Sequence, residues 1–267
     1  MIKSRSITPV RVVIIGSGNV AEALVYNIAD DDNFDLVGIV ARNRERGRWL
    51  ASLGNTKWGQ HTTELSDADI YIITVSDSAV ESVAKSNTFP EGAIVVHTAG
   101  SVPLEVLPER GGCRGILYAF QSFSSGRKVK LSDVTIFIEA ESKEVEERIR
   151  SFALLLSPRV EYATSELRRK IHLAGVFVNN FANHMWAIGR DMMVQEGLSF
   201  DVLKPLIAET TAKALSCDDP KRMQTGPAVR GDRGVVERHL AMLDTKERES
   251  KIYNEITESI WETSKRI

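Results

Sequence analysis

Two short runs near the N-terminus carry residue types that bind phosphate groups. The first is a glycine turn of the form G-x-G-x-x-A, made of Gly16, Ser17, Gly18, Asn19, Val20 and Ala21. It follows a β-branched apolar run at residues 10–15 and precedes a segment with helical character at residues 19–29. Unpaired N–H groups and the dipole at the start of such a helix favour negative charge. The context predicts a dinucleotide pyrophosphate site at this turn.

The second run, Arg42, Asn43 and Arg44, follows an apolar segment at residues 36–40. Units of this type that bind NAD usually place a carboxylate there, which holds the ribose 2′-hydroxyl. A carboxylate would repel a 2′-phosphate, whereas arginine binds phosphate through paired hydrogen bonds. The run therefore predicts NADP rather than NAD. The alternative is a solvated basic loop, because Arg46 and Arg48 follow.

Polar residues and glycines also follow two later apolar runs, at residues 70–75 and 93–96. The carboxyl ends of parallel strands form the ligand-binding edge of an open α/β sheet. We expect the nicotinamide side of the site to be bordered by Val75, Ser76, Thr98, Ala99 and Gly100. His97 stands beside this loop, where it could transfer a proton or simply cap the turn.

Further candidates for substrate binding or proton transfer come from the second half of the chain. His172 and Asn180 lie in a segment with helical periodicity at residues 165–195, and they could share a helix face with His184. Each histidine could instead be a partnered structural residue. Arg230 follows a Thr-Gly-Pro sequence and could bind an anion, or it could pair with Asp232 to make a long connection rigid. Lys170, Tyr118 and Asp77 complete the candidates for proton transfer.

Apolar runs alternate with helical segments up to residue 163, and this alternation predicts an α/β fold with a doubly wound parallel Rossmann sheet. From residue 164 the pattern is helical. We expect one long helix at residues 165–195, further helices at 201–215, 235–243 and 251–264, and a coil at 216–233. The predicted domains are residues 1–163, which bind NADP, and residues 164–267, an all-helical domain for substrate binding and dimerisation.

Composition excludes several classes of function. The net charge of −2 gives no general reason to expect a nucleic-acid partner. Cys113 and Cys217 match no metal-ligand spacing, so no metal site is expected, and a reducing cytoplasm is the default. The first nine residues contain no apolar core of signal-peptide length, and no apolar stretch approaches the length of a membrane span.

The chain resembles the 6-phosphogluconate-dehydrogenase-like superfamily, with pyrroline-5-carboxylate reductase and deazaflavin-dependent NADP reductases as neighbours through its first half. Over nearly its whole length it is similar to a bacterial family of Rossmann-like proteins with a C-terminal domain of unknown function. The residues that carry this resemblance are Gly16–Ala21, His97–Ser101, Gln121–Phe123, His172–Phe177, Asn179, Asn180, Thr225–Pro227, Arg230, Asp232, His239 and Leu240.

The resemblance implies nucleotide binding, oxidoreductase activity and a helical, often dimer-forming domain. Family members often carry a His-Pro pair where this chain has Tyr118 and Ala119. Related hydroxyacid dehydrogenases have a catalytic lysine a few residues before an asparagine. Residues 173–177 contain no lysine, which disfavours that activity.

The leading hypothesis is an NADP-dependent oxidoreductase. It would transfer a hydride between NADP(H) and a small polar carbonyl or imine substrate bound between the two domains. His97, His172, Asn180 and Arg230 are the candidates for binding the substrate or transferring a proton. The alternative is a non-catalytic NADP(H)-binding sensor or scaffold protein, and a third possibility is a deazaflavin-linked reductase. We expect a cytoplasmic homodimer, formed through the helical domain, with no nucleic-acid or membrane partner.

Overall fold

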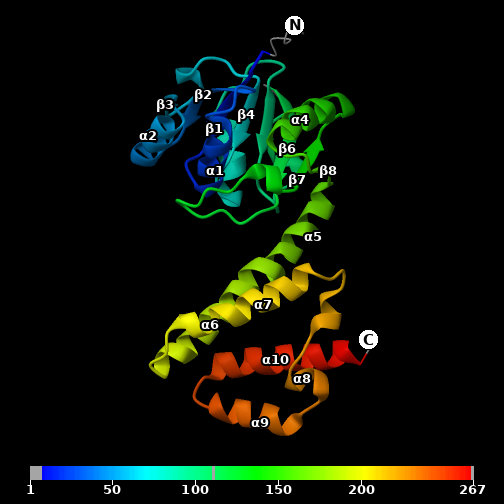
Figure 1. The fold of residues 1–267 in the computed structure, drawn as a ribbon. Helices are drawn as coiled ribbons and strands as arrows, with labels where there is room; N and C mark the ends of the chain where they lie inside the picture. The colour runs from blue at the N-terminus through cyan, green and yellow to red at the C-terminus, as the bar shows by residue number, and fades with distance from the viewer. Residues whose placement is uncertain (1–7, 110–111, 266–267) are drawn as a thin grey trace, which may run out of the picture. The chain divides into compact units, whose positions relative to one another are not determined.

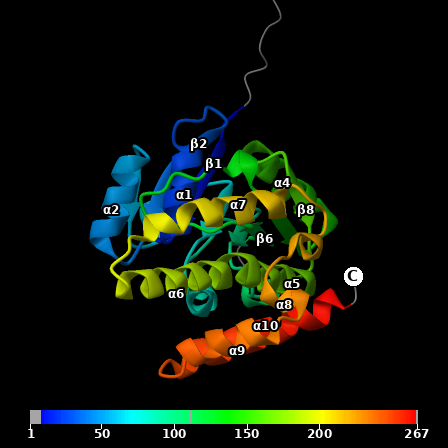
Figure 2. The same ribbon diagram turned by 60° about the horizontal axis from the view of Figure 1, so that its bottom comes forward.

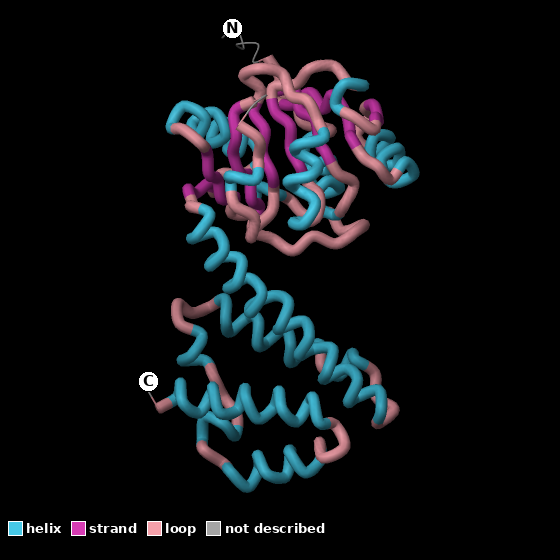
Figure 3. Tube along the Cα trace, turned by 180° about the vertical axis from the view of Figure 1, so that it is seen from behind, coloured by secondary structure: helices cyan, strands magenta, loops and turns pink. Residues whose placement is uncertain are grey.

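The computed structural model describes residues 8–109 and 112–265. Most of the N-terminal segment considered above for a signal peptide lies outside these ranges. The chain forms two compact units that divide between Asn179 and Asn180. Figure 1 shows the elements of both units, and Figure 3 shows that the strands all lie in the first unit, whereas the second consists of helices and loops.

The first unit is built on one eight-stranded sheet with the order β3-β2-β1-β4-β5-β6-β7-β8. Neighbouring strands are parallel except β6 and β7, which are antiparallel. The central strands are rich in Val and Ile because they are buried on both faces. The strands are β1 (Val10–Ile15), β2 (Phe34–Val40), β3 (Lys57–Gly59), β4 (Ile70–Ile73), β5 (Ile94–His97), β6 (Cys113–Ala119), β7 (Ile136–Ala140) and β8 (Val160–Tyr162).

Helices pack against both faces of the sheet, so the expected doubly wound α/β fold is confirmed. One face is covered by α1 (Asn19–Ile28), α2 (Arg44–Leu53) and α4 (Lys143–Leu156). The other face packs against α3 (Val80–Ser86) and the start of α5 (Ser165–Gly175). Short 3₁₀ turns lie between the helices and strands of the described chain. They are at Thr62–Glu64, Asp77–Ala79, Leu104–Val106, Leu131–Asp133, Phe200–Val202 and Pro220–Met223.

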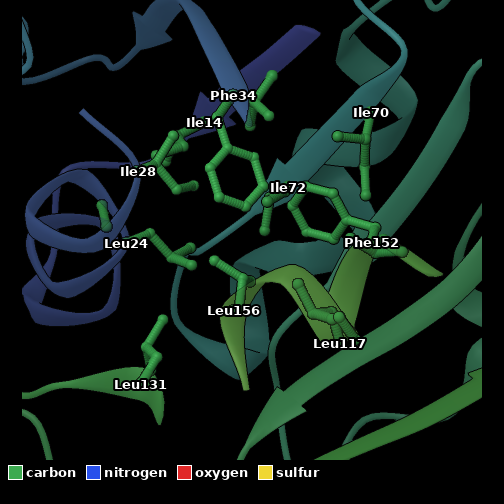
Figure 4. Close-up of a cluster of buried hydrophobic side chains, with 14 of the residues drawn as sticks. Ile14, Leu24, Ile28, Phe34, Ile70, Ile72, Leu117, Leu131, Phe152 and Leu156 are labelled. Carbon is green, nitrogen blue, oxygen red and sulfur yellow. The ribbon is translucent and has the colours of Figure 1, made fainter. Parts of the chain in front are cut away.

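The larger core lies between the sheet and α1, α2 and α4. Figure 4 shows Leu24 and Ile28 of α1 and Phe152 of α4 around Ile72 of β4. The rings of Phe34 and Phe152 meet edge to face with their centroids 5.6 Å apart. Each fully buried aliphatic side chain of this kind contributes about 1.5–3 kcal/mol to folding. This core fixes the strand ends that carry the candidate site.

The second unit is helical, as expected. A π-helical segment, Val176–Phe181, precedes α6 (Ala182–Gln195) and contains the division between the units. The later helices are α7 (Lys204–Leu215), α8 (Pro227–Arg230), α9 (Arg233–Met242) and α10 (Glu247–Ser264). Helices α9 and α10 lie side by side (Figure 1, Figure 2). Gly231 takes a left-handed φ of 65° between α8 and α9, where a Cβ would collide with the Trp261 ring of α10.

Three expectations about the elements were wrong in detail. Strand β3 was missed because three residues carry no readable period. The expected single α-helix at 165–195 contains the π-helical segment. Hydrogen bonds in such a segment run from i to i+5, so a face predicted from α-helical spacing does not continue through it. The expected coil at 216–233 contains a 3₁₀ turn and α8. The domain boundary at residue 163 stays a prediction; it lies just after β8, and the two compact units divide between Asn179 and Asn180.

Within the described ranges, no helix combines the length and apolar character that crossing a membrane requires. The same residues contain no group of three or more His, Cys, Asp or Glu side chains that could hold a metal ion.

Candidate functional site

The glycine turn is held tightly at the carboxyl end of β1. The Gly16 N–H donates to the Val40 carbonyl of β2 at 2.8 Å, and the Thr74 N–H after β4 donates to the Ile15 carbonyl at 2.7 Å. Gly16 has a φ of +132°, and a Cβ there would collide with the Thr74 hydroxyl. Gly18 begins α1 as its exposed N-cap with no side chain to cap the helix. The first N–H groups of α1 therefore remain available to an anion.

An ion pair between Glu22 and Arg46 braces this turn. Glu22 is 2% exposed and binds the Arg46 guanidinium, whose Nε donates to the Ser17 carbonyl at 3.2 Å. The guanidinium also lies over the Trp49 ring, 4.1 Å from its centroid. Arg46 therefore connects the start of α2 to the glycine turn. The sequence had offered this residue only as part of a solvated basic loop.

The loop after β6 is tied to the same helix. Glu22 accepts hydrogen bonds from the Gly126 N–H at 2.8 Å and from the Ser125 hydroxyl at 3.3 Å. The Asn19 amide donates to the Phe123 carbonyl at 3.0 Å. Glu22 thus links the loop after β6 to the glycine turn, and the sequence analysis did not single it out. Its one signal in the sequence is an acidic residue in the first turn of the helix that follows the glycine turn.

The predicted 2′-phosphate residues follow β2 and are exposed. Arg42 and Arg44 both reach solvent, and the Arg44 guanidinium lies 5.9 Å from the centroid of the Trp58 ring. Asn43 is the N-cap of α2, and its side-chain oxygen accepts the Arg46 N–H at 3.0 Å. The Asn43 oxygen is therefore engaged within α2, whereas the two guanidiniums face outward.

Two residues of the predicted pyrophosphate motif pack inward. Ala21 is fully buried in the core beneath α1, and Val20 is half-buried against the same cluster. Their side chains let the helix approach the sheet closely. Any contact that they make with a phosphate would come from the backbone.

His97, at the end of β5, holds its own loop. The residue is fully buried, its Nδ1 accepts the Ala99 N–H at 3.2 Å, and its Nε2 lies 3.4 Å from the Pro103 carbonyl. This pattern assigns the proton to Nε2. Burial, followed by the nearby Arg168 charge, lowers the pKa of His97 to about 4. The ring is therefore neutral at pH 7 with both nitrogens engaged, and this geometry favours the turn-capping interpretation.

The other predicted nicotinamide-side residues lie at the adjacent strand ends. The Thr98 hydroxyl is 3.4 Å from the Ile73 carbonyl, and Ala99 is buried. Val75 is half-buried, and the Ser76 hydroxyl is exposed beside Ser78 at 3.5 Å. These residues share the carboxyl edge of β4 and β5, and their place beside a nicotinamide stays a prediction.

Tyr118 and His172 form a pair that the sequence analysis did not foresee. The Tyr118 hydroxyl lies 3.0 Å from His172 Nδ1, although the residues are 54 positions apart. Gly100 makes room for the pair, because a Cβ there would come within 2.7 Å of His172 Nδ1 and 2.8 Å of Tyr118 Cζ. Burial, followed by the Asp77 charge, raises the pKa of Tyr118 to about 12, so the phenol stays protonated. His172 itself is exposed.

An exposed carboxylate lies at the same sheet edge. The Ser101 hydroxyl donates to Asp77, which joins the loop after β5 to the turn after β4. Lys170, the other sequence candidate on α5, is exposed and pairs with Glu166 at 2.7 Å. The arrangement in the first unit thus brings together Gly100, Tyr118, His172 and Asp77.

The remaining candidates belong to the second unit. Asn180 lies in the π-helical segment, and Arg230 is the last residue of α8; both are exposed. Asp232, the predicted partner of Arg230, is the N-cap of α9 and accepts the Val235 N–H at 3.1 Å. The roles of Asn180 and Arg230 toward a substrate stay predictions.

Two family models match the chain. The model "NADP oxidoreductase coenzyme F420-dependent" matches residues 11–100, and the model "Domain of unknown function (DUF2520)" matches residues 134–260. None of the curated proteins compared with the chain matches it.

Several solved structures share the fold. A crystal structure described as a "putative NADP oxidoreductase" from Bacteroides fragilis is 35% identical, with a TM-score of 0.87 over 96% of this chain and 100% of its own. A protein from Thermotoga maritima is 19% identical, with a TM-score of 0.78 over 95% and 99% of the two chains. An imine reductase from Streptomyces aurantiacus is 14% identical, with a TM-score of 0.61 over 94% and 93%. The last two likenesses show the fold.

The match to the Bacteroides fragilis protein spans both units and exceeds the identity at which only a fold is shared. The fold and the two family models agree with the resemblance seen in the sequence. This chain therefore belongs to the family of NAD(P)-dependent oxidoreductases that join a Rossmann domain to a helical domain of the DUF2520 type.

Proposed function

We propose that this protein is an NADP-dependent reductase that acts on a small polar imine or carbonyl compound. The observation that carries the proposal is the Tyr118–His172 pair beside Gly100, at the sheet edge where a Rossmann domain binds its ligand. Protonated groups at such an edge suit reductions, because adding a hydride to the carbon of a C=N or C=O bond requires a proton on the nitrogen or oxygen.

The residues of the first unit fit a dinucleotide. The cradle at Gly16 would be filled by a Cβ, and the exposed Gly18 N-cap leaves the start of α1 open. Arg42 and Arg44 are exposed after β2 and would bind the 2′-phosphate. When bound, NADPH supplies the hydride. The preference for NADP over NAD rests on these two arginines.

His172 is the proposed proton donor, and Tyr118 is its positioning residue. As a proton donor, the ring would carry N–H groups on both nitrogens: Nδ1–H would donate to the Tyr118 oxygen, and Nε2–H of this exposed side chain would donate to the substrate. The high pKa of Tyr118 keeps the phenol neutral, so it orients the imidazole and does not compete as the acid.

Turnover tests the proposal. NADPH oxidation is followed by absorbance with a panel of cyclic imines and small aldehydes or ketones. We expect His172→Gln to lower kcat about 100-fold, as loss of a general acid does, with NADPH affinity unchanged. His61→Gln, a change at an exposed histidine that follows β3 and is no candidate for the site, is the control. Equal rates for wild type and His172→Gln would remove His172 from the reaction.

Two alternatives have distinct outcomes in the same assay. A protein that binds NADPH but oxidises it with no member of the panel would be the non-catalytic sensor or scaffold. A protein that transfers hydride from NADPH to an oxidised deazaflavin would be the deazaflavin-linked reductase. The name of one matching family model includes a deazaflavin, coenzyme F420. The Tyr118–His172 pair favours turnover over the non-catalytic sensor or scaffold role.

We also propose that the protein is a cytoplasmic homodimer formed through the helical unit. Large apolar side chains are exposed there, including Leu206 at 64% and Leu215 at 84%. Exposed apolar surface of this kind marks interaction sites. Cys113 and Cys217 are free thiols, which suits a reducing compartment.

A further inference from the structure

A buried arginine lies one helical turn before His172. Arg168 is fully buried, and its Nη1 donates to the Glu139 carboxylate at 2.5 Å. Its Nη2 donates to the Val102 carbonyl and to the Ser165 hydroxyl, the latter at 3.2 Å. Among the described residues, its Nε is a buried side-chain nitrogen without a hydrogen-bond partner. A fully buried guanidinium in a Rossmann unit requires an explanation.

Ser165 extends the cluster to three elements. Its N–H and hydroxyl both donate to Glu139, at 2.9 and 2.7 Å, and its hydroxyl accepts the Leu104 N–H at 3.3 Å. Glu139 belongs to β7, Val102 and Leu104 to the segment after β5, and Ser165 and Arg168 to α5. The cluster therefore fixes the start of α5 against the sheet and against the loop that contains Gly100.

Strand register places this cluster on the same face of the sheet as the Tyr118–His172 pair. Ile116 of β6 is opposite Glu139, and Tyr118 is opposite Phe137, so these four side chains lie on one face of the sheet. Tyr118 and Phe137 belong to the apolar cluster on that face, which also includes Ile171 of α5. His172 follows Arg168 by four residues, which puts both on the same side of α5.

Stability alone does not account for the cluster. Removing two charges from water is expensive, and buried ion pairs are often no more stabilising than apolar side chains of similar size. What such a pair supplies is a directional constraint, because several donors and acceptors must meet in one geometry. Here the constraint acts on the segment that carries Gly100 and on the helix that carries His172.

We propose that Arg168, Glu139 and Ser165 are positioning residues that set His172 against Tyr118. They would act through α5 and the loop after β5, without touching a substrate. The catalytic meaning of this cluster rests on the proposed function. The geometric claim does not, because it concerns one hydrogen bond within the first unit.

Nuclear magnetic resonance of histidine ring nitrogens tests the geometry without a substrate. In protein labelled with ¹⁵N-histidine, we expect the chemical shift of His172 Nδ1 to report the hydrogen bond to Tyr118. The Tyr118→Phe variant gives the chemical shift of Nδ1 when that bond is lost. Arg168→Met should move the signal most of the way to the Tyr118→Phe value. Arg169→Met, at the exposed neighbouring arginine, is the matched control and should leave it in place.

Milder variants keep the test decisive if Arg168→Met does not fold. Ser165→Ala removes one link of the cluster, and Arg168→Lys keeps the charge but cannot reach Glu139 and Val102 together. Both should shift the Nδ1 signal partway. A His172 signal that stays at its wild-type position in every folded variant would overturn the proposal.

Kinetics separate this inference from the proposed function. With an imine that the wild type reduces, Arg168→Lys should lower kcat about tenfold at unchanged KM for NADPH. In a His172→Gln background it should lower kcat no further, because the residue acts through His172. Additive losses would indicate a general structural role and refute the inference. If no substrate is turned over, the proposed function fails, and the nitrogen signals still decide the geometric claim.

Discussion

Acid should destabilise the sheet unit through His97. The ring is fully buried, and its pKa is lowered from 6.5 to about 4, first by burial and then by the charge of Arg168. The unfolded chain therefore takes up a proton over a pH range in which the folded protein keeps the ring neutral. The stabilisation is fully present above about pH 6.5 and is lost as the pH falls toward 4.

The magnitude follows from the difference between the two pKa values. A pKa difference of this size, converted at about 1.4 kcal/mol per pH unit, corresponds to about 3 kcal/mol between pH 7 and pH 4. His97→Gln removes the titration and keeps an amide that can accept the Ala99 N–H or donate to the Pro103 carbonyl. The variant will be less stable than wild type at pH 7, because its side chain fits the site less well.

The assay compares urea midpoints of wild type and His97→Gln from pH 7 to pH 4. Hydrogen-exchange protection of β5 reports unfolding of the sheet unit. Carboxylates titrate in both proteins, so their effect cancels in the comparison. The difference in free energy of unfolding between wild type and His97→Gln should therefore narrow by about 3 kcal/mol as the pH falls. A gap between wild type and His97→Gln that stays constant to within about 1 kcal/mol would refute the assignment of His97 as a neutral buried ring.

Three further outcomes follow from the same structure. Gly16→Ala should abolish NADPH binding measured by calorimetry and lower the free energy of unfolding by about 2 kcal/mol. The left-handed φ and the clash with Thr74 both oppose a Cβ at this position. Binding of NADPH with wild-type affinity would contradict this prediction. Glu22→Ala should lower the free energy of unfolding by about 2 kcal/mol, less than for a fully buried pair because Arg46 can reach water; urea denaturation measures it, and no change would show that the brace is dispensable. Sedimentation velocity at micromolar concentration should show a dimer, and a monomer would remove the proposed assembly.

Local signals made much of the fold predictable. The glycine turn, the β-branched runs and the helical periods of α1, α2 and α4 each lie within a few turns of chain. Such segments carry their own patterns, so their order alone indicated a doubly wound sheet. Strand β3 and the π-helical segment were missed because one is too short for a period and the other depends on tertiary packing.

The candidate site was less predictable because it is assembled from distant parts of the chain. Tyr118 and His172 were separate candidates, and their contact depends on the antiparallel pairing of β6 with β7 and on α5 packing against that face. Four arginines lie close together in the sequence, at positions 42, 44, 46 and 48, and the sequence does not show which of them pairs with Glu22. In the structure the partner of Glu22 is Arg46. His97 and His172 were both candidates for proton transfer in the sequence, and burial separates the two.

Calorimetric titration with NADPH and NADH, for wild type and Arg42→Ala, tests the central claim most directly. We expect wild type to bind NADPH more tightly than NADH, and Arg42→Ala to lose about 1.5–3 kcal/mol of NADPH affinity while NADH binding is unchanged. Lys57→Ala, at an exposed cation on β3, is the matched control and should behave as wild type. If neither nucleotide binds, the glycine turn is structural in this protein and the reductase account is wrong.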